Sequence, residues 1–430
     1  MRSAAAALAA VGLLLIAAGC GSSSAAITQT SSGADAASLV PASALAYVSA
    51  DANLDSQQLQ VLTDVFGPLP SKLDYKNDIH PALGDRVNLA VLGIDNGQPE
   101  AVALVQPTDE AKLSALAKKF DQGSEHYTVE QIGGWSVVAD SAEAFQSVRN
   151  ADSGSSLADS ANFKSAMSQV GDSGFATVYA SGSGVQQLPA KLQALVRVAG
   201  SPRWIAASII ADKTALQIKA RAAGGASPAA YRPALLHDVP SGAILAVSFK
   251  NVNQLLARVQ SEPLLRTSLP PFVTSLRSIS GEGVLYLLPG TIIPVVTLEV
   301  HPSDPAAATK ALRGVAAKTG NMLPLHVERH GKVVLLTNAA PGTSPGSGSI
   351  TDDQSFKDAL VAADVPAKVT WLAYADIQRL APILQALASL SGNGQAKPST
   401  TAKLDKFQTL VAFGARSGST RSVEARLTFR

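Results

Sequence analysis

Few residue types in this chain could carry out chemistry. Among its 430 residues are a single cysteine, Cys20, and six histidines. A thiolate can act as a nucleophile or a metal ligand, and an imidazole can act as a general base or a metal ligand. The spacing of these residues therefore decides whether acylation, hydrolysis or metal binding is predicted. The histidines are His80, His126, His237, His301, His326 and His330.

His326 and His330 are four residues apart, which is a metal-ligand spacing when both residues lie on a helix. The surrounding segment LHVERHGK has the pattern of a strand followed by a turn. In a strand, residues four apart are separated by roughly 13 Å. The matching positions in the first half of the chain, Thr128 and Ile132, carry no ligand group. Two exposed hairpin histidines are favoured over a metal site, and no metal or cofactor is predicted.

A hydrolytic site is not indicated either. The chain has no G-x-S-x-G elbow, and the SGSG segment at 181–184 lacks the Lys-Ser/Thr ending of a phosphate-binding loop. A turn with a helix cap is favoured there. Asp352 and Asp353 precede the helix-like FKDAL and match Asp159 and Ser160 before ANFKSAM. Helix capping explains these acids without a pair of catalytic carboxylates.

The three tryptophans could line a glycan-binding groove if they shared one surface. Each lies in a strand-like run, however, and aromatic residues in such runs mostly belong to the core. A core role is therefore favoured for Trp135, Trp204 and Trp371.

The first twenty residues, MRSAAAALAAVGLLLIAAGC, are typical of an export signal. Arg2 is the only charged residue before Asp35, and an apolar run extends from Ala4 to Ala18. A positive start followed by a short apolar run is the pattern of a secretory signal peptide. The run is short for a membrane-spanning helix, which needs about 20 residues.

Cys20 follows directly after the small residues Ala17, Ala18 and Gly19. This A-A-G-C sequence resembles the lipobox of bacterial lipoproteins. The resemblance implies that residues 1–19 are a cleaved signal peptide and that the Cys20 thiol carries a diacylglycerol. Two acyl chains give stable anchoring, at about 0.8 kcal/mol per buried CH₂ group. The alternatives are a plain secretory signal and an uncleaved anchor helix. The expected location is the extracytoplasmic face of the cell membrane.

The amino-acid composition is that of a folded protein and argues against nucleic-acid binding. Hydrophobic residues make up 46% of the chain and charged residues only 16%, with a net charge of +2. The apolar share is enough for a sizeable core, whereas no basic footprint for nucleic acid is present. Residues 20–38 are rich in Ser, Gly and Ala, and they are predicted to form a flexible tether.

The remainder contains an internal duplication with an offset of about 193–199 residues. Segments of the first half recur in the same order in the second half. The pairs are VPASALAYVS and VPSGAILAVS, VQPTD and VHPSD, VEQIGGWSVVAD and VERHGKVVLLTN, and SLADSANFKSAM and SITDDQSFKDAL. We therefore predict two homologous lobes, 39–224 and 232–430, joined by a linker at 225–231. A soft segment of the second lobe, APGTSPGSGS, is interpreted as a loop insertion relative to the first lobe.

Within each lobe, short apolar runs flanked by turn residues predict strands. Hairpin turns are expected at Gly133-Gly134 and at His330-Gly331. The segments that begin at Asp109 and Asp304 have helical spacing with an acidic cap. Antiparallel strands with interspersed helices predict an α+β fold: two tandem lobes, each a mainly antiparallel sheet with packed helices.

The segments LVPASALAYVSAD and SANFKSAM, with a later Tyr-containing strand, resemble a bacterial family of envelope and lipoprotein sequences, the domain of unknown function 3352. This resemblance agrees with an exported protein and implies no established activity. We expect a non-catalytic envelope lipoprotein that contacts the membrane through its lipid and binds or scaffolds an unknown envelope protein. The alternatives are a carrier or sensor of an apolar ligand and, third, an envelope hydrolase.

Overall fold

The computed structural model describes residues 33–53, 55–66, 75–95, 97–121, 126–171, 174–225, 228–267, 276–290, 293–319, 324–341, 346–390 and 405–430. They form two compact units. Unit 1 contains the described residues up to Leu188 and Pro202–Gly224, and unit 2 contains Pro189–Ser201 and Gly225–Arg430. Both units combine antiparallel strands with helices, so the predicted α+β class is confirmed.

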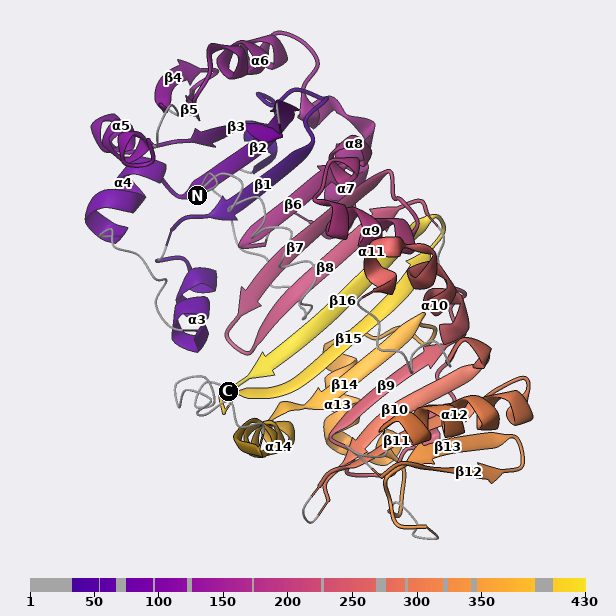
Figure 1. The fold of residues 1–430 in the computed structure, drawn as a ribbon. Coiled ribbons are helices and arrows are strands. Elements are labelled where there is room, and N and C mark those ends of the chain that lie inside the picture. The colour runs from indigo at the N-terminus through magenta and orange to yellow at the C-terminus, as the bar shows by residue number, and fades with distance from the viewer. Residues whose placement is uncertain are drawn as a thin grey trace. The chain divides into compact units, whose positions relative to one another are not determined.

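Unit 1 contains eight antiparallel strands in the order β4-β5-β3-β2-β1-β6-β7-β8 (Figure 1). The strands are β1 (Ala46–Asp51), β2 (Arg86–Asp95), β3 (Gln98–Val105), β4 (Thr128–Ile132), β5 (Trp135–Ala139), β6 (Ala176–Ser181), β7 (Trp204–Asp212) and β8 (Ala215–Ala223). The helices and helical turns are α2 (Gly33–Ala37), α3 (Gln57–Phe66), η1 (Tyr75–Ile79), α4 (His80–Leu83), α5 (Glu110–Lys119), α6 (Ala142–Asp152), η2 (Leu157–Asp159), α7 (Ala161–Val170) and α8 (Gly182–Gln186).

Unit 2 contains eight antiparallel strands in the order β12-β13-β11-β10-β9-β14-β15-β16. The strands are β9 (Leu245–Lys250), β10 (Glu282–Leu288), β11 (Val295–His301), β12 (His326–His330), β13 (Val333–Thr337), β14 (Trp371–Asp376), β15 (Phe407–Ser417) and β16 (Thr420–Phe429). The helices and helical turns are α9 (Ala190–Ala199), η3 (Leu235–His237), α10 (Val252–Ser261), α11 (Pro263–Arg266), α12 (Pro305–Thr319), η5 (Ile350–Asp352), α13 (Gln354–Ala362) and α14 (Ile377–Leu390).

The strand order of unit 2 is that of unit 1 when β1 to β8 are replaced by β9 to β16. The repeated order agrees with the internal duplication seen in the sequence. The predicted hairpins are present as β4–β5 and β12–β13. Gly133 and Gly134 form the first turn with positive φ angles of 57° and 79°, which glycine adopts without a steric penalty. The second turn is Gly331-Lys332, one residue later than predicted.

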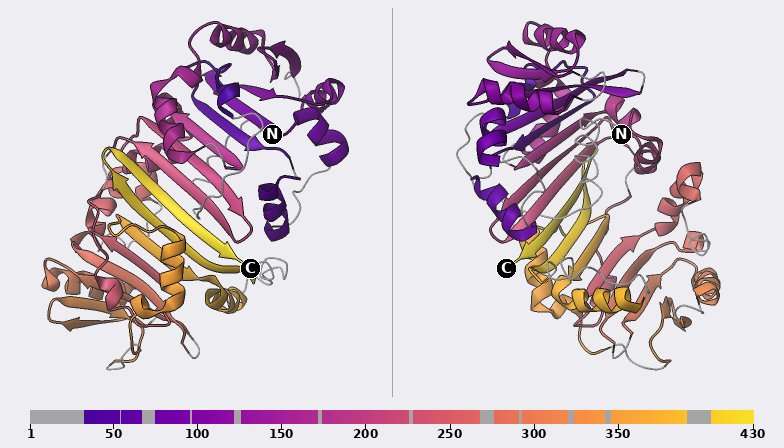
Figure 2. Two further views of the ribbon diagram at one scale, coloured as in Figure 1. Left: turned by 180° about the vertical axis from the view of Figure 1, so that it is seen from behind. Right: turned by 60° about the vertical axis from the view of Figure 1, so that its left-hand side comes forward.

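One face of each strand set is covered by a helix that the sequence predicted. Helix α5 packs on Val105, and α12 packs on Val300, the matching residue of unit 2. Both helices have an acidic N-cap: the Asp109 carboxylate accepts a hydrogen bond from the backbone N–H of Lys112, and the Asp304 carboxylate accepts two from the following turn. Figure 2 shows α5 and α12 from further directions. The predicted caps are confirmed.

The aromatic core is also repeated. In unit 1 the ring of Phe163 lies edge-on to Tyr47 and Tyr179, with ring centres 5.7 and 5.2 Å apart. In unit 2 Phe356 lies edge-on to Tyr374 at 5.0 Å. The two phenylalanines occupy matching positions, Phe163 in α7 and Phe356 in α13, which are buried as their repetition predicts.

The described chain begins inside the predicted tether. Residues 33–37 form α2, whose Ala36 and Ala37 are fully buried in the core of unit 1. Folded structure therefore starts earlier than residue 39, because these two small side chains pack under the sheet. Within the described ranges, no helix is both long and apolar enough to cross a membrane.

Candidate functional site

The second face of the sheet differs between the units. In unit 1 this face of β3, β4 and β5 is covered by α6. Phe145 and Val148 of α6 are buried against Leu104 of β3 and Val137 of β5. Arg149 of the same helix forms an ion pair with Glu130 of β4. Helix α6 therefore closes the end of the unit 1 core (Figure 1).

In unit 2 the described residues between β13 and η5 contain no helix equivalent to α6. That connection runs through 338–349 and contains the Pro-, Gly- and Ser-rich segment interpreted from the sequence as an insertion. The interpretation is wrong, because the segment is shorter than the α6-containing connection of unit 1 and stands in its place. Pro and Gly disfavour helix formation, which explains the exchange. We call the corresponding side of β11, β13 and β12 the open face.

Strand register identifies the residues of the open face, since directly paired residues project to the same side of a sheet. Glu299 of β11 pairs with Leu335 of β13, which pairs with Glu328 of β12. Leu335 is half-buried, whereas the matching Val137 of unit 1 is fully buried. The open face contains Thr297, Glu299, His301, Val333, Leu335, Thr337, His326, Glu328 and His330.

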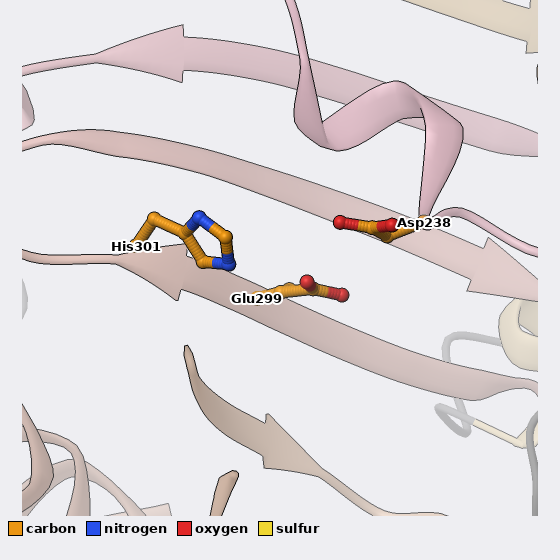
Figure 3. A group of neighbouring side chains, drawn as sticks. All are labelled: Asp238, Glu299 and His301. Carbon is orange, nitrogen blue, oxygen red and sulfur yellow. The ribbon is translucent and has the colours of Figure 1, made fainter. Parts of the chain in front are cut away.

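Three side chains converge at one end of the open face. Glu299 and His301 project from β11 toward Asp238, which directly follows η3 (Figure 3). One potential ligand atom from each residue lies within 4.8 Å of the other two. We call Asp238, Glu299 and His301 the Asp-Glu-His cluster. Sequence analysis did not single out this combination, because Asp238 is far from β11 along the chain.

Glu299 is the buried member of the cluster. Its residue is 6% exposed, while Asp238 and His301 are exposed. Among the described residues, no hydrogen bond to the Glu299 carboxylate is formed. Burial and, to a smaller extent, the negative charge of Asp238 raise the pKa of Glu299 to about 7, against the opposing effect of His330. The cluster is thus able to accept a proton or a cation at near-neutral pH.

A second polar group lies beside the cluster on the edge strand β12. The Glu328 carboxylate bonds both rings of the histidine pair predicted from the sequence, at 3.0 Å to His326 Nε2 and 3.2 Å to His330 Nε2. These hydrogen bonds lower the pKa of Glu328, that from His330 being the stronger. His330 is exposed as expected, and His326 is half-buried. The structure places the two rings on either side of a carboxylate.

The other candidates from the sequence have structural roles. The Ser181 hydroxyl accepts a hydrogen bond from the N–H of Gly184 and caps α8. A Cβ atom at Gly184 would lie 1.9 Å from the carbonyl oxygen of Leu45, so close packing requires glycine there. Asp353 caps α13 and Ser160 caps α7. The capping prediction is confirmed for Ser181 and Asp353, whereas Asp352 lies within η5 and Asp159 accepts a hydrogen bond from Ser156.

Two of the three tryptophans are core residues, as predicted. Trp135 and Trp204 are 6% and 1% exposed, and Trp371 is half-buried in β14. The lipobox residues Ala17, Ala18 and Gly19 and the lipidation candidate Cys20 lie outside the described residues. Their assignment stays a prediction.

A basic pocket lies on the opposite side of unit 2 from the open face. Its volume is about 360 Å³, and Lys310 and Arg313 of α12 line it together with Arg329 of β12. Ala306 and Thr309 complete the lining. Such a lining suits an anion better than an apolar ligand.

Comparison with known proteins gives little guidance. No family model matches the chain, and no curated protein matches it. Among solved structures, a crystal form of TP0453 is aligned with a TM-score of 0.19 and 9% sequence identity, over 72% of this chain and 93% of that chain. A likeness this small carries no argument about function.

Proposed function

We propose that this protein is an exported lipoprotein, anchored through Cys20 to the extracytoplasmic face of the cell membrane. Its two folded units bind or scaffold an envelope partner and do not catalyse a reaction. The observation that carries the proposal is the A-A-G-C sequence at residues 17–20. It lies at the end of an apolar run that follows the positively charged Arg2.

Two features of the folded units favour binding over catalysis. The hydroxyl and carboxylate motifs weighed as catalytic candidates, Ser181 and Asp353, serve as helix caps. The residues that the duplication repeats are also turn, capping and core residues, such as Phe163 and Phe356, and not a set of catalytic groups. A carrier of an apolar ligand is the second candidate from the sequence, but the described pocket beside α12 is basic and favours an anion.

The anchor is tested by substituting Cys20. The full chain is expressed in a bacterial host fed with labelled palmitate, and the membranes are partitioned with a phase-separating detergent. We expect the unaltered chain to carry label and enter the detergent phase. Cys20→Ser removes the only thiol, so label is lost and the protein moves to the aqueous phase. Ser22→Ala is the matched control and keeps both properties.

Retention of Cys20→Ser in the detergent phase would show that the apolar run itself holds the chain in the membrane. Labelling of both variants would place the lipid elsewhere. The binding role is tested by crosslinking intact cells and purifying the anchored chain. Recovery of a reproducible envelope protein supports that role, and repeated recovery of the chain alone contradicts it.

A further inference from the structure

We propose that the Asp-Glu-His cluster of unit 2 binds one divalent transition-metal ion of the zinc class. The ligands are one carboxylate oxygen from Asp238, one from Glu299 and one imidazole nitrogen from His301. This site is independent of the lipid anchor and of any envelope partner.

The donor set selects the metal class. Carboxylate oxygen with imidazole nitrogen suits Zn²⁺ and related ions, whereas Ca²⁺ and Mg²⁺ prefer oxygen ligands alone. Two carboxylates also match the charge of a divalent ion. Three protein ligands are a common number for Zn²⁺ when a water completes the coordination.

The geometry requires only small adjustments. Zinc bonds to oxygen and nitrogen of about 2.0–2.2 Å place tetrahedral ligand atoms about 3.4 Å apart. The three candidate atoms already lie within 4.8 Å of one another. Asp238 and His301 are exposed and can change rotamer, while Glu299 is held in place by its surroundings.

Glu299 provides the second, independent observation. It is 94% buried, no described residue bonds its carboxylate, and the side chain points toward the other two ligands (Figure 3). Burial of most of the Glu299 side chain is costly, because partial desolvation disfavours its charge. A bound cation removes that cost, and a purely structural position would be better filled by an apolar residue.

Unit 1 has buried apolar residues at the positions that match the two carboxylates of the cluster. The repeat aligns Asp238 with Leu39, Glu299 with Leu104 and His301 with Gln106. Leu39 and Leu104 are 2% and 0% exposed in the core that α6 closes. The scaffold therefore accepts leucine at both carboxylate positions, whereas the described residues of unit 2 have three ligand groups here and no equivalent of α6.

The neighbouring triplet on β12 is the competing site. His326 and His330 are joined through Glu328, and their strand spacing holds the two rings on opposite sides of that carboxylate. Their potential ligand atoms do not form a group as compact as the Asp-Glu-His cluster. We therefore assign the metal to the cluster and make the triplet an outcome of the test.

The experiment is a calorimetric titration of the full chain with ZnCl₂. The protein is purified in detergent, stripped with a chelator and buffer-exchanged before titration near pH 7.5. We expect one Zn²⁺ per chain. Glu299→Gln and His301→Gln each remove a ligand and weaken binding at least tenfold. Glu299→Leu reproduces the residue of unit 1 and provides a foldable alternative if Glu299→Gln does not fold.

Two controls make the result decisive. His126→Gln changes an exposed histidine of unit 1 and leaves the affinity unchanged. His326→Thr with His330→Ile introduces the residues of unit 1 on β12, and it weakens binding less than threefold. The proposal is overturned if the unaltered chain binds no Zn²⁺, if the cluster variants bind normally, or if only the β12 variant loses affinity. Preference for Ca²⁺ over Zn²⁺ would overturn the metal class.

Discussion

Units 1 and 2 share a strand order, a capped helix on one sheet face and an edge-on aromatic core, but they differ in what covers the other face. In unit 1, α6 buries apolar side chains against β3 and β5. In unit 2 the corresponding connection contains no described helix, and the strands of the open face carry charged and imidazole side chains, of which Glu299 is buried. The same sheet face is thus apolar in unit 1, where α6 packs on it, and carries polar groups in unit 2, where no described helix does.

The largest expected effect on stability comes from weakening the packing of α6 against the sheet of unit 1. Phe145 of α6 is 2% exposed in the core. Phe145→Ala leaves a cavity, and such changes cost about 3–5 kcal/mol of unfolding free energy. Denaturant titration followed by circular dichroism measures the loss. Val361→Ala, at a side chain that is 77% exposed in α13, changes stability by less than about 0.5 kcal/mol. An equally small loss for Phe145→Ala would show that the packing of α6 on the sheet contributes little to the free energy of unfolding.

The next largest effect is the pH dependence that Glu299 gives to the stability of unit 2. The pKa of Glu299 is about 7 in the folded chain and 4.5 in the unfolded chain, so the folded chain binds more protons between these values. Without metal, the stabilisation is complete below pH 4.5 and is lost as pH rises through 7. The loss amounts to roughly 3 kcal/mol. The charged or titratable groups facing Glu299 are Asp238, His301, His330 and, from β10, Tyr286.

Comparison of Glu299→Leu with the unaltered chain isolates this effect. In chelator, thermal melting between pH 5 and 8 should show a falling stability for the unaltered chain and a flatter curve for Glu299→Leu. Glu299→Leu should also be the more stable protein at pH 8, because Leu104 occupies the matching position in unit 1. Parallel curves for the two proteins would contradict the buried carboxylate as the cause.

The smallest effect tests what the two units share. Asp109 caps α5 with one backbone hydrogen bond, and Asp304 caps α12 with two. Replacing either by alanine removes one N-cap, and we expect a loss of about 1 kcal/mol in each case. Equal losses measured by denaturant titration support equivalent packing of the two helices. A several-fold difference would show that the units differ on this face as well.

Much of the fold was predictable because its signals are local. Short apolar runs flanked by turn residues predicted the strands, and Asp before an amphipathic run predicted the caps of α5 and α12. The repeated Phe163 and Phe356 predicted matching core positions. The Pro- and Gly-rich segment was interpreted as an insertion, because its composition signals a loop but gives no sign of the helix α6 that occupies the same place in unit 1.

The candidate site was not predicted for a different reason. His326 and His330 drew attention through their spacing, but the cluster joins Asp238 to Glu299 and His301 across strands. A signal was present in the repeat, where Leu39, Leu104 and Gln106 are exchanged for ligand residues. Comparison of the two repeats position by position would have found it.

The sequence by itself determined the predicted export signal, the duplication and the class of fold, because these depend on composition, order and local periodicity. Only the tertiary structure decided which sheet face has no covering helix among the described residues and which side chains meet there. Strand pairing brings residues far apart in the chain into contact, and burial then gives Glu299 a property that its residue type alone does not have.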